Sequence, residues 1–305
     1  MSFKHVVALA AAFGLLAGSA SAEELTGTLK KIKETGEIAI GHRDSSIPFS
    51  YLDDNQKPIG YAMDICAHVV EAVKAELKLD TLAVKLTPVT SATRIPLIAN
   101  GTVDLECGST TNNLDRQQQA SFTNSHFLTA SRFVSKKTSN LKSIDDLKGK
   151  TVVSTAGTTN IKQVNELNTA RGLGIKIIPA KDHAEGFLMV ETDRAVAFAM
   201  DDILLATLVA GSKTPSAYVI SEDAFSLPEP YGIMLRKDDP AFKAVVDRAT
   251  AALYTSPEGP KLFAKWFENP IPPKGLNVNL PLAGAMKNAL AHPSDSADPK
   301  AYLAP

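Results

Sequence analysis

The segment of residues 91–113 most constrains what this chain can fold into. It reads Ser-Ala-Thr-Arg-Ile-Pro-Leu-Ile-Ala-Asn-Gly-Thr-Val-Asp-Leu-Glu-Cys-Gly-Ser-Thr-Thr-Asn-Asn. The Ser/Thr residues before Arg94 predict a helix start, and Gly101 predicts its end. The apolar stretch 103–106 then predicts a buried strand. The segment therefore indicates alternating helices and strands.

The same segment predicts an anion site. A second helix is expected to begin near Thr111 or Asn112, directly after the hydroxyl run that starts at Ser109. Free N–H groups at a helix start attract an anion, and the guanidinium of Arg94 offers a bidentate fork to a carboxylate. The chemistry indicated is carboxylate capture, which needs no catalytic group.

Residues 1–22 have the pattern of a secretory signal. Lys4 supplies the positive end, residues 6–16 the apolar core, and Ala20-Ser-Ala22 the cleavage site. The alternative, a membrane anchor, is disfavoured because the apolar run is too short to span a bilayer comfortably. We expect an exported, soluble mature protein.

Cys66 and Cys107 are the only cysteines. An even pair in an exported protein usually forms a disulfide, the alternative being two buried free thiols. The bridge would close a loop of about 41 residues, for which loop-closure entropy gives roughly 4 kcal/mol. It would tie the helix that begins at Gly60 to the strand end beside Ser109, and so stiffen the floor of the site.

Length and composition exclude several classes. The 305 residues are 44% hydrophobic, enough for a large core and more consistent with two lobes than one. A net charge of −1 without any basic block gives no support for binding nucleic acid or a membrane surface. Aromatic residues make up only 6%, which argues against a site that stacks sugars or bases.

Strand and helix patterns alternate along the chain and predict α/β lobes with largely parallel sheets. Expected strands lie at 37–41, 82–86, 151–154, 175–179, 195–200 and 232–236. Expected helices lie at 61–77, 159–170, 182–191, 241–253 and 260–267. Residues 53–60 predict a hairpin loop, 225–231 a connector and 274–305 an extended or loosely helical tail. Periodicity leaves open which lobe contains the chain after Gly232.

Motifs of enzymes and cofactor sites are missing or incomplete. The Gly149-Lys-Thr151 run lacks the first glycine of a P-loop, because Ile144 stands there. Gly172-Leu-Gly174 lacks the third glycine of a dinucleotide loop. No zinc-spaced Cys/His set or Gly-x-Ser-x-Gly elbow occurs. We therefore predict no cofactor, no metal and no catalytic residues.

Four further positions are candidates on the second lobe. Thr159 belongs to another Gly-Thr-Thr helix opening, and Asp201 and Asp202 close an apolar strand, where open α/β sheets place ligand groups. The alternative is a helix N-cap, which would explain one of the two aspartates and leave the other without a structural role. His183 taken alone is read as an ordinary surface histidine.

Long segments carry a family resemblance. They span residues 41–50, 90–97, 100–113, 180–183, 194–202, 231–240 and 265–273. In these segments the chain resembles the periplasmic solute-binding proteins of polar amino acid ABC transporters, and within them those for glutamate and aspartate. The resemblance covers essentially the whole mature chain.

The resemblance implies a two-lobe α/β periplasmic binding protein fold of type II. Two hinge strands would join the lobes, with the ligand in the cleft between them. Residues 23–130 and 230–305 would form lobe 1, with a C-terminal extension, and 131–229 would form lobe 2. The chain after Tyr231 would then return to the first lobe.

The resemblance also assigns ligand roles at the amino acid's backbone end. Arg94 would grip the α-carboxylate, helped by the backbone N–H groups of Thr111 and Thr159. Asp201 and the Ser109 region would hold the α-ammonium group.

At the other end, Arg43 and His183, with Ser91 nearby, would face the side-chain carboxylate, so that His183 becomes a ligand residue. Such a set matches a dicarboxylic amino acid, whose charges must be paired in a dry cleft.

The implied function is periplasmic capture of glutamate or aspartate by a monomer, for delivery to an inner-membrane ABC permease with its ATPase subunits. One alternative is a broader binder that also takes glutamine and asparagine. Another is an exported dehydratase, since some dehydratases for cyclohexadienyl acids resemble this fold. That chemistry needs a poised acid and a larger pocket, and nothing in the sequence favours either. A sensor ectodomain would need a following transmembrane helix.

Overall fold

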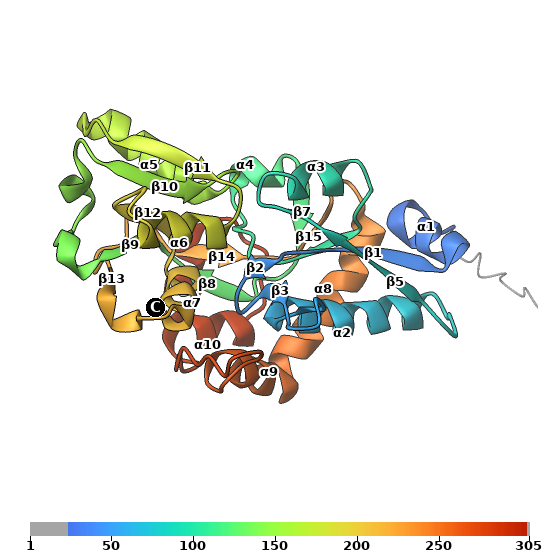
Figure 1. The fold of residues 1–305 in the computed structure, drawn as a ribbon. Coiled ribbons are helices and arrows are strands. Elements are labelled where there is room, and N and C mark those ends of the chain that lie inside the picture. Colours follow the sequence, from blue (N-terminus) through green and yellow to red (C-terminus); the bar gives the residue numbers. More distant parts are fainter. Residues whose placement is uncertain (1–23, 304–305) are drawn as a thin grey trace, which may run out of the picture.

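The computed structural model of the chain describes residues 24–303. The predicted signal, residues 1–22, lies outside this range. Two five-stranded sheets, each covered by helices, form two lobes side by side (Figure 1). The first lobe, right in this view, contains the N-terminal elements, and the second, at left, contains the elements of the middle of the chain.

The sheet of the first lobe has the strand order β5-β1-β6-β15-β7. Its strands are β1 (Glu37–His42), β5 (Ala83–Pro88), β6 (Leu105–Cys107), β7 (Ala120–Phe122) and β15 (Met234–Arg236). Strand β1 is parallel to β5 and β6, whereas β15 is antiparallel to β6 and β7. Because β15 lies in this sheet, the chain after Gly232 does return to the first lobe.

Helices and a small hairpin sheet surround this first sheet. The helices are α1 (Gly27–Thr35), α2 (Tyr61–Glu76), α3 (Arg94–Ala99), α4 (Leu114–Gln117), α8 (Pro240–Thr255) and α9 (Glu258–Phe267). The hairpin strands are β2 (Ser45–Ser46), β3 (Ser50–Leu52) and β4 (Pro58–Ile59). Helix α2 forms as predicted, because its apolar residues repeat at helical spacing and all of that face is buried.

The second sheet repeats the same plan in the order β11-β10-β12-β9-β13. Its strands are β9 (Ser131–Lys136), β10 (Thr151–Thr155), β11 (Lys176–Ala180), β12 (Ala197–Asp201) and β13 (Tyr218–Ile220). The helices are α5 (Thr159–Arg171), α6 (His183–Glu191) and α7 (Asp202–Gly211), with 3-10 turns η1 (Lys137–Ser139), η2 (Ile144–Leu147) and η3 (Pro215–Ala217). Helix α7 was not predicted, since its apolar residues follow the strand without a turn signal.

An antiparallel pair of strands connects the two lobes (Figure 1). It consists of β8 (Phe127–Thr129) and β14 (Glu229–Tyr231), which pair along their whole length. The predicted connector at 225–231 is therefore partly a strand. Its last three residues are buried because they pair with β8.

A cluster of aromatic rings lies beside this hinge. Phe49 is at the centre, with its ring centroid 5.0 Å from Phe127 and 5.2 Å from Tyr231. Phe263 and Phe267 of α9 stack on the same group, 4.5 Å apart. Because large aromatic areas are buried here, the hinge strands are anchored to the first lobe.

The two cysteines form the predicted disulfide. Cys66 of α2 is joined to Cys107 at the end of β6, with the two Cα atoms 6.3 Å apart. The bridge ties the helix to the sheet of the first lobe, two residues before Ser109. The stiffening of the site's floor by this bridge stays a prediction.

Two sequence-based boundaries are wrong. The strand predicted at 103–106 is observed as β6, which begins two residues later than predicted. Helix α4 begins at Leu114 and is capped by the side chain of Asn113, not near Thr111. The reason is that Thr111 is held extended by a bridge to Tyr231 of the hinge.

The tail is also more ordered than expected. It contains α10 (Gly284–Ala291) and a 3-10 turn, η4 (Pro299–Tyr302). Its backbone accepts hydrogen bonds from Asn112 and Gln117 at the carbonyl of Asp295. The Tyr302 hydroxyl lies 2.8 Å from that of Ser125. The tail thus folds back against the first lobe and the hinge.

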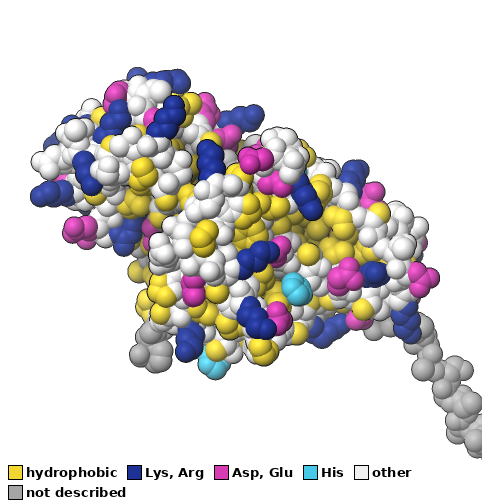
Figure 2. Space-filling view, turned by 60° about the horizontal axis from the view of Figure 1, so that its bottom comes forward, with side chains coloured by type: hydrophobic (Ala, Val, Ile, Leu, Met, Phe, Trp, Pro, Cys, Tyr) yellow, Lys and Arg dark blue, Asp and Glu magenta, His cyan; other side chains and the backbone are white. Residues whose placement is uncertain are grey.

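Within residues 24–303, no helix combines the length and apolar character needed to cross a bilayer. On the face shown in Figure 2, basic and acidic side chains are interspersed and no large area carries one sign. This mixed surface fits the nearly neutral composition.

Candidate ligand-binding site

A small cavity lies between the two lobes and is lined by side chains of both. Its empty volume is ≈ 190 Å³. It is lined by Ser91, Arg94, Ser109, Thr111, Thr158, Thr159, Asn160, His183, Met200, Asp201 and Leu204. All the residues predicted to bind ligand except Arg43 are in this set.

Arg94 enters the cavity from the first residue of α3, and its side chain is 2% exposed. Its guanidinium donates to the carbonyl of Ser109 at 3.1 Å and to the Thr110 hydroxyl. Glu106 lies 4.0 Å away as a counter-charge and itself accepts from Thr110 at 2.6 Å. Burial lowers the pKa of Arg94, and Glu106 opposes that shift. The Nε atom of Arg94 has no partner within the described residues.

Arg43 directly follows strand β1. It is not among the residues that line the cavity, but it contacts two that are, Ser91 and His183. Its Nη2 donates to the Ser91 hydroxyl at 2.8 Å and lies 3.5 Å from His183 Nε2. Its Nη1 is buried without a hydrogen-bond partner in the part of the chain described. Burial, reinforced by the charge of Arg94, lowers the pKa of Arg43 to about 10, so it remains a cation.

His183 begins helix α6 and is fully enclosed. Burial, followed by the charges of Arg43 and Arg94, lowers its pKa well below the usual value, so the imidazole is neutral. Its Nδ1 lies 2.9 Å from the Thr155 hydroxyl. Because an arginine can only donate, Nε2 is the acceptor in this neutral ring and Nδ1 carries the proton. The imidazole is therefore buried and lines the cavity, whereas His183 taken without the family resemblance was read as a surface residue.

Asp201 ends strand β12 at the opposite side of the cavity. Its carboxylate accepts from Asn160 at 2.8 Å and from the Tyr231 hydroxyl. Burial, and then the charge of Glu229, raises the pKa of Asp201 to about 7. Asp201 occupies the cap position of α7 but its side chain does not cap the helix. Asp202 instead bonds Thr129, so the two aspartates have separate partners.

Thr159 is the first residue of α5, as predicted, and Thr158 caps the helix by accepting from the Ile161 N–H at 3.3 Å. The hydroxyls of Thr111 and Thr159 lie 3.4 Å apart across the cleft. The helix start on the second lobe is therefore real, whereas the one expected at Thr111 is replaced by extended backbone.

The lobes touch at Gly157. Its φ is +78°, and a Cβ at this position would lie 2.6 Å from the Cα of Ala92 and 2.7 Å from the carbonyl of Ser91. Both are backbone atoms of the other lobe, which cannot yield easily. Only glycine permits this approach, which closes the cleft over the cavity.

Buried donors without partners indicate what such a cavity can hold. Arg43 Nη1, Arg94 Nε and Ser109 Oγ are all unpaired in the described structure. Buried polar atoms nearly always have partners in proteins, so these three indicate an anionic guest. The described residues contain no group of three or more His, Cys, Asp or Glu that could hold a metal ion.

Residues 38–269 match the bacterial extracellular solute-binding proteins, family 3. The chain belongs to this family. It is 54% identical to an L-glutamate/L-aspartate-binding protein of Pseudomonas aeruginosa over 284 residues, 93% of this chain and 94% of the other. A glutamate/aspartate import solute-binding protein of Salmonella typhimurium is 48% identical over 301 residues, 97% of this chain and 99% of the other.

Solved structures of similar fold agree. A mutant of the arginine-binding protein of T. maritima has a TM-score of 0.70 and 25% identity, covering 79% of this chain and 99% of the other. The predicted two-lobe fold and the predicted family are thus confirmed for this solute-binding protein. Its residues beyond 269, including α10, lie outside the family match.

Sequence reasoning missed three charged residues of this solute-binding protein's site. Glu106 was taken as part of a strand, and Glu229 as part of a connector. Arg116 of α4 donates to the carbonyls of Thr111 at 2.8 Å and Gly157 at 3.1 Å, joining the two lobes. Burial, and then Arg94, lowers its pKa to about 9. The sequence signal that could have identified Arg116 is its position shortly after the run of hydroxyl residues at 109–111.

Proposed function

We propose that this solute-binding protein captures L-glutamate and L-aspartate and delivers them to an inner-membrane ABC permease with its ATPase subunits. The observation that carries the proposal is the unpaired Nη1 of buried Arg43, beside His183 and Ser91. An apolar ligand side chain would leave this donor unpaired, at a cost of about 1–3 kcal/mol or more. The names of the two relatives support the same ligands.

Each end of the cavity has a proposed role. Arg94 grips the α-carboxylate, together with the backbone N–H groups of Thr111 and Thr159. Asp201 and the Ser109 region hold the α-ammonium group.

At the far end, Arg43, His183 and Ser91 read the side-chain carboxylate. The neutral imidazole lies where that carboxylate would raise its pKa, so His183 can become a second cation on binding.

The remaining proposals concern export, oligomeric state and the division of the chain into two lobes. Residues 1–22 direct the chain to the periplasm and are removed, and the mature protein acts as a monomer without cofactor. Residues 23–130 and 230–305 form one lobe and 131–229 the other. The hinge pair β8 and β14 supports these boundaries, because it lies where the chain passes between the two sheets.

Two other readings fit less well. A binder that also takes glutamine and asparagine would leave the donors at the Arg43 end facing an amide N–H₂ group. An exported dehydratase needs room for a ring and an acid poised to protonate a leaving hydroxyl, and the residues that line the cavity leave little free space in this closed form. We therefore propose binding without catalysis.

Calorimetry with a panel of twenty amino acids tests the proposal. We expect glutamate and aspartate to bind and their amides to bind at least tenfold more weakly. Equal affinity for glutamine would establish the broader reading instead. Absence of binding by either acidic amino acid would overturn the proposal.

A further inference from the structure

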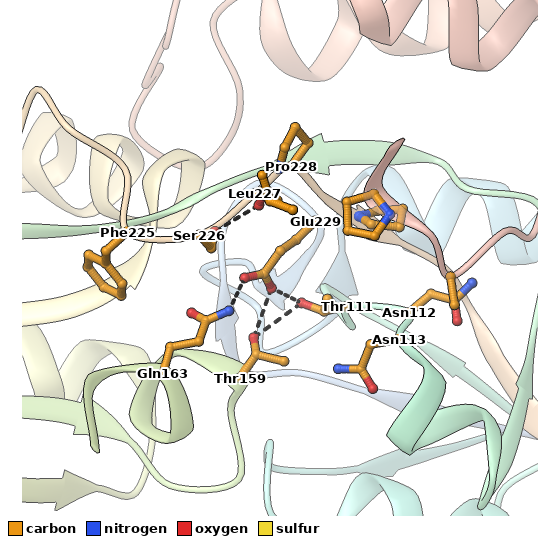
Figure 3. Close-up of a pocket in the computed structure, with 13 residues that line it drawn as sticks. Thr111, Asn112, Asn113, Thr159, Gln163, Phe225, Ser226, Leu227, Pro228 and Glu229 are labelled. Carbon is orange, nitrogen blue, oxygen red and sulfur yellow. Dashed lines mark hydrogen bonds between the residues drawn. The ribbon is translucent and has the colours of Figure 1, made fainter. Parts of the chain in front are cut away.

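Glu229 is a buried carboxylate of hinge strand β14, 6% exposed, to which no role has so far been given. Figure 3 shows it surrounded by donors. Its Oε2 accepts from the hydroxyls of Thr111 and Thr159, each at 2.9 Å. Its Oε1 accepts from the amide of Gln163 and from Ser131 at 3.3 Å.

The donors and their acceptor come from three parts of the molecule. Thr111 belongs to the first lobe, Thr159 and Gln163 belong to α5 of the second lobe, and Glu229 itself lies on the hinge. One oxygen atom therefore joins the two lobes. Hydrogen bonds to a carboxylate are about twice as strong as those between neutral groups, so this three-way contact is a strong one.

Glu229 does not line the ligand cavity. It lines a neighbouring cavity of ≈ 590 Å³, whose wall also includes Pro228 and Pro299 (Figure 3). Thr111 and Thr159 line both cavities. The two threonines thus form the partition between the cavities, and the carboxylate lies behind them.

We propose that Glu229 is a positioning residue for ligand binding, which holds Thr111 and Thr159 together across the closed cleft. This inference rests on the proposed function, in which the backbone N–H groups of these threonines bind the α-carboxylate. With both hydroxyls fixed on one oxygen, the two N–H groups are held at a set separation. Arg116, which bonds the Thr111 carbonyl, offsets the buried negative charge.

The inference predicts a particular defect. Glu229→Ala should weaken glutamate and aspartate binding alike, by about tenfold or more, because a charge-assisted contact is lost. The change should be in koff, since the open protein meets its ligand before the threonines come together. The ratio of glutamate to glutamine affinity should not move, because the side-chain end is untouched.

Stopped-flow and calorimetric binding measurements on the full exported protein test this. Glu166→Ala, an exposed carboxylate on α5, is the matched control and should bind as the wild type does. Glu229→Gln keeps the volume and one acceptor oxygen, so it should fold even if the alanine variant does not, and it should show a smaller rise in koff.

A double variant without the two threonine hydroxyls tests whether Glu229 acts through those hydroxyls or contacts the ligand itself. Thr111→Val with Thr159→Val removes both hydroxyls and keeps both backbone N–H groups. If Glu229 acts through the hydroxyls, adding Glu229→Gln to this background should change koff by less than twofold. An undiminished effect there, an unchanged koff in Glu229→Ala and Glu229→Gln, or a shifted glutamate to glutamine ratio would overturn the inference.

The proposed function can fail separately. If the wild type binds another amino acid but neither glutamate nor aspartate, the function is wrong. The same variants are then measured with that amino acid, because every amino acid presents an α-carboxylate. Loss of affinity in Glu229→Ala would still support the inference.

Discussion

The two lobes share one sheet plan and contribute opposite charges to the cavity. The first lobe supplies the cations, namely Arg43, Arg94 and Arg116, together with Glu106 beneath them. The second supplies a neutral imidazole, His183, and the carboxylate Asp201. The same fold thus provides an electrostatic anchor on one side and a selective cover on the other.

This difference predicts an order of events. In the proposed function an anionic ligand meets Arg94 in the cavity, with the charges of Arg43 and Arg116 nearby on the same lobe. The Cys66–Cys107 bridge ties α2 to the sheet of this lobe. The second lobe adds few charges, and its contacts with the first include those at Gly157 and Arg116. We expect capture by the first lobe, and then selection as the second closes.

The largest effect should follow the loss of the anchor. Arg94→Ala should abolish measurable binding of every amino acid, since removing one partner of a buried charge pair costs about 3–5 kcal/mol. Calorimetry measures this, with Arg171→Ala, an exposed arginine of the second lobe, as the control. Retained micromolar binding would show that the α-carboxylate is held elsewhere.

The rigidity of the anchor can be tested by removing the bridge. Cys66→Ser with Cys107→Ser should lower the free energy of unfolding by about 2–4 kcal/mol, because the unfolded chain is no longer closed into a loop. Denaturant unfolding measures the loss, and ligand selectivity should persist. Two free thiols found by mass spectrometry of the exported protein would contradict the premise.

The site residues of the first lobe, the anchor, were more predictable from sequence than those of the second lobe, the cover. Arg94 and the cysteines are marked by local patterns, a helix start and an even pair, and the structure places them as those patterns indicate. His183 looked like a surface residue because no local pattern shows that Thr155 and Arg43 enclose it.

The missed residues share one physical cause. Glu106, Arg116 and Glu229 have their role through partners distant in sequence, such as the contact between Thr111 and Glu229. Periodicity reports which face of an element is buried, and it does not report what a buried charge meets. The extended backbone at Thr111 was missed for the same reason, since its partner is on the hinge.

Selectivity should depend on the cover. In the wild type, glutamate should bind more tightly than glutamine by about 2–4 kcal/mol, the difference between a charge-assisted and a neutral contact. His183→Ala should reduce this gap by about 1.5–3 kcal/mol, while recognition of the α-carboxylate by Arg94 persists. Competition calorimetry measures both affinities.

His68→Ala, an exposed histidine of α2, is the control for the loss of an imidazole as such. If His183→Ala left the preference for glutamate unchanged, Arg43 and Ser91 alone would read the side-chain carboxylate. The cover would then close the cavity without selecting its contents.

The smallest effect should come from the contact that lets the cover close. Gly157→Ala places a methyl group within 2.6–2.7 Å of backbone atoms of Ser91 and Ala92, which must move apart. Overpacking of this kind costs about 1–3 kcal/mol. The cost applies only to the closed form, so all ligands should lose affinity equally. Gly172→Ala is a matched control, because it has a φ of +58° and nothing within 4 Å of its Cβ position.

Solution scattering distinguishes this closure defect from simple strain. Both alanine variants carry a left-handed residue and should lose similar stability, about 1–2 kcal/mol. With saturating glutamate, the wild type and Gly172→Ala should contract, whereas Gly157→Ala should keep a larger radius of gyration. Equal contraction in all three would mean that the lobes close without this contact. Closure would then depend on the ligand contacts of His183 and Asp201 alone, and the backbone contact would follow from closure without contributing to it.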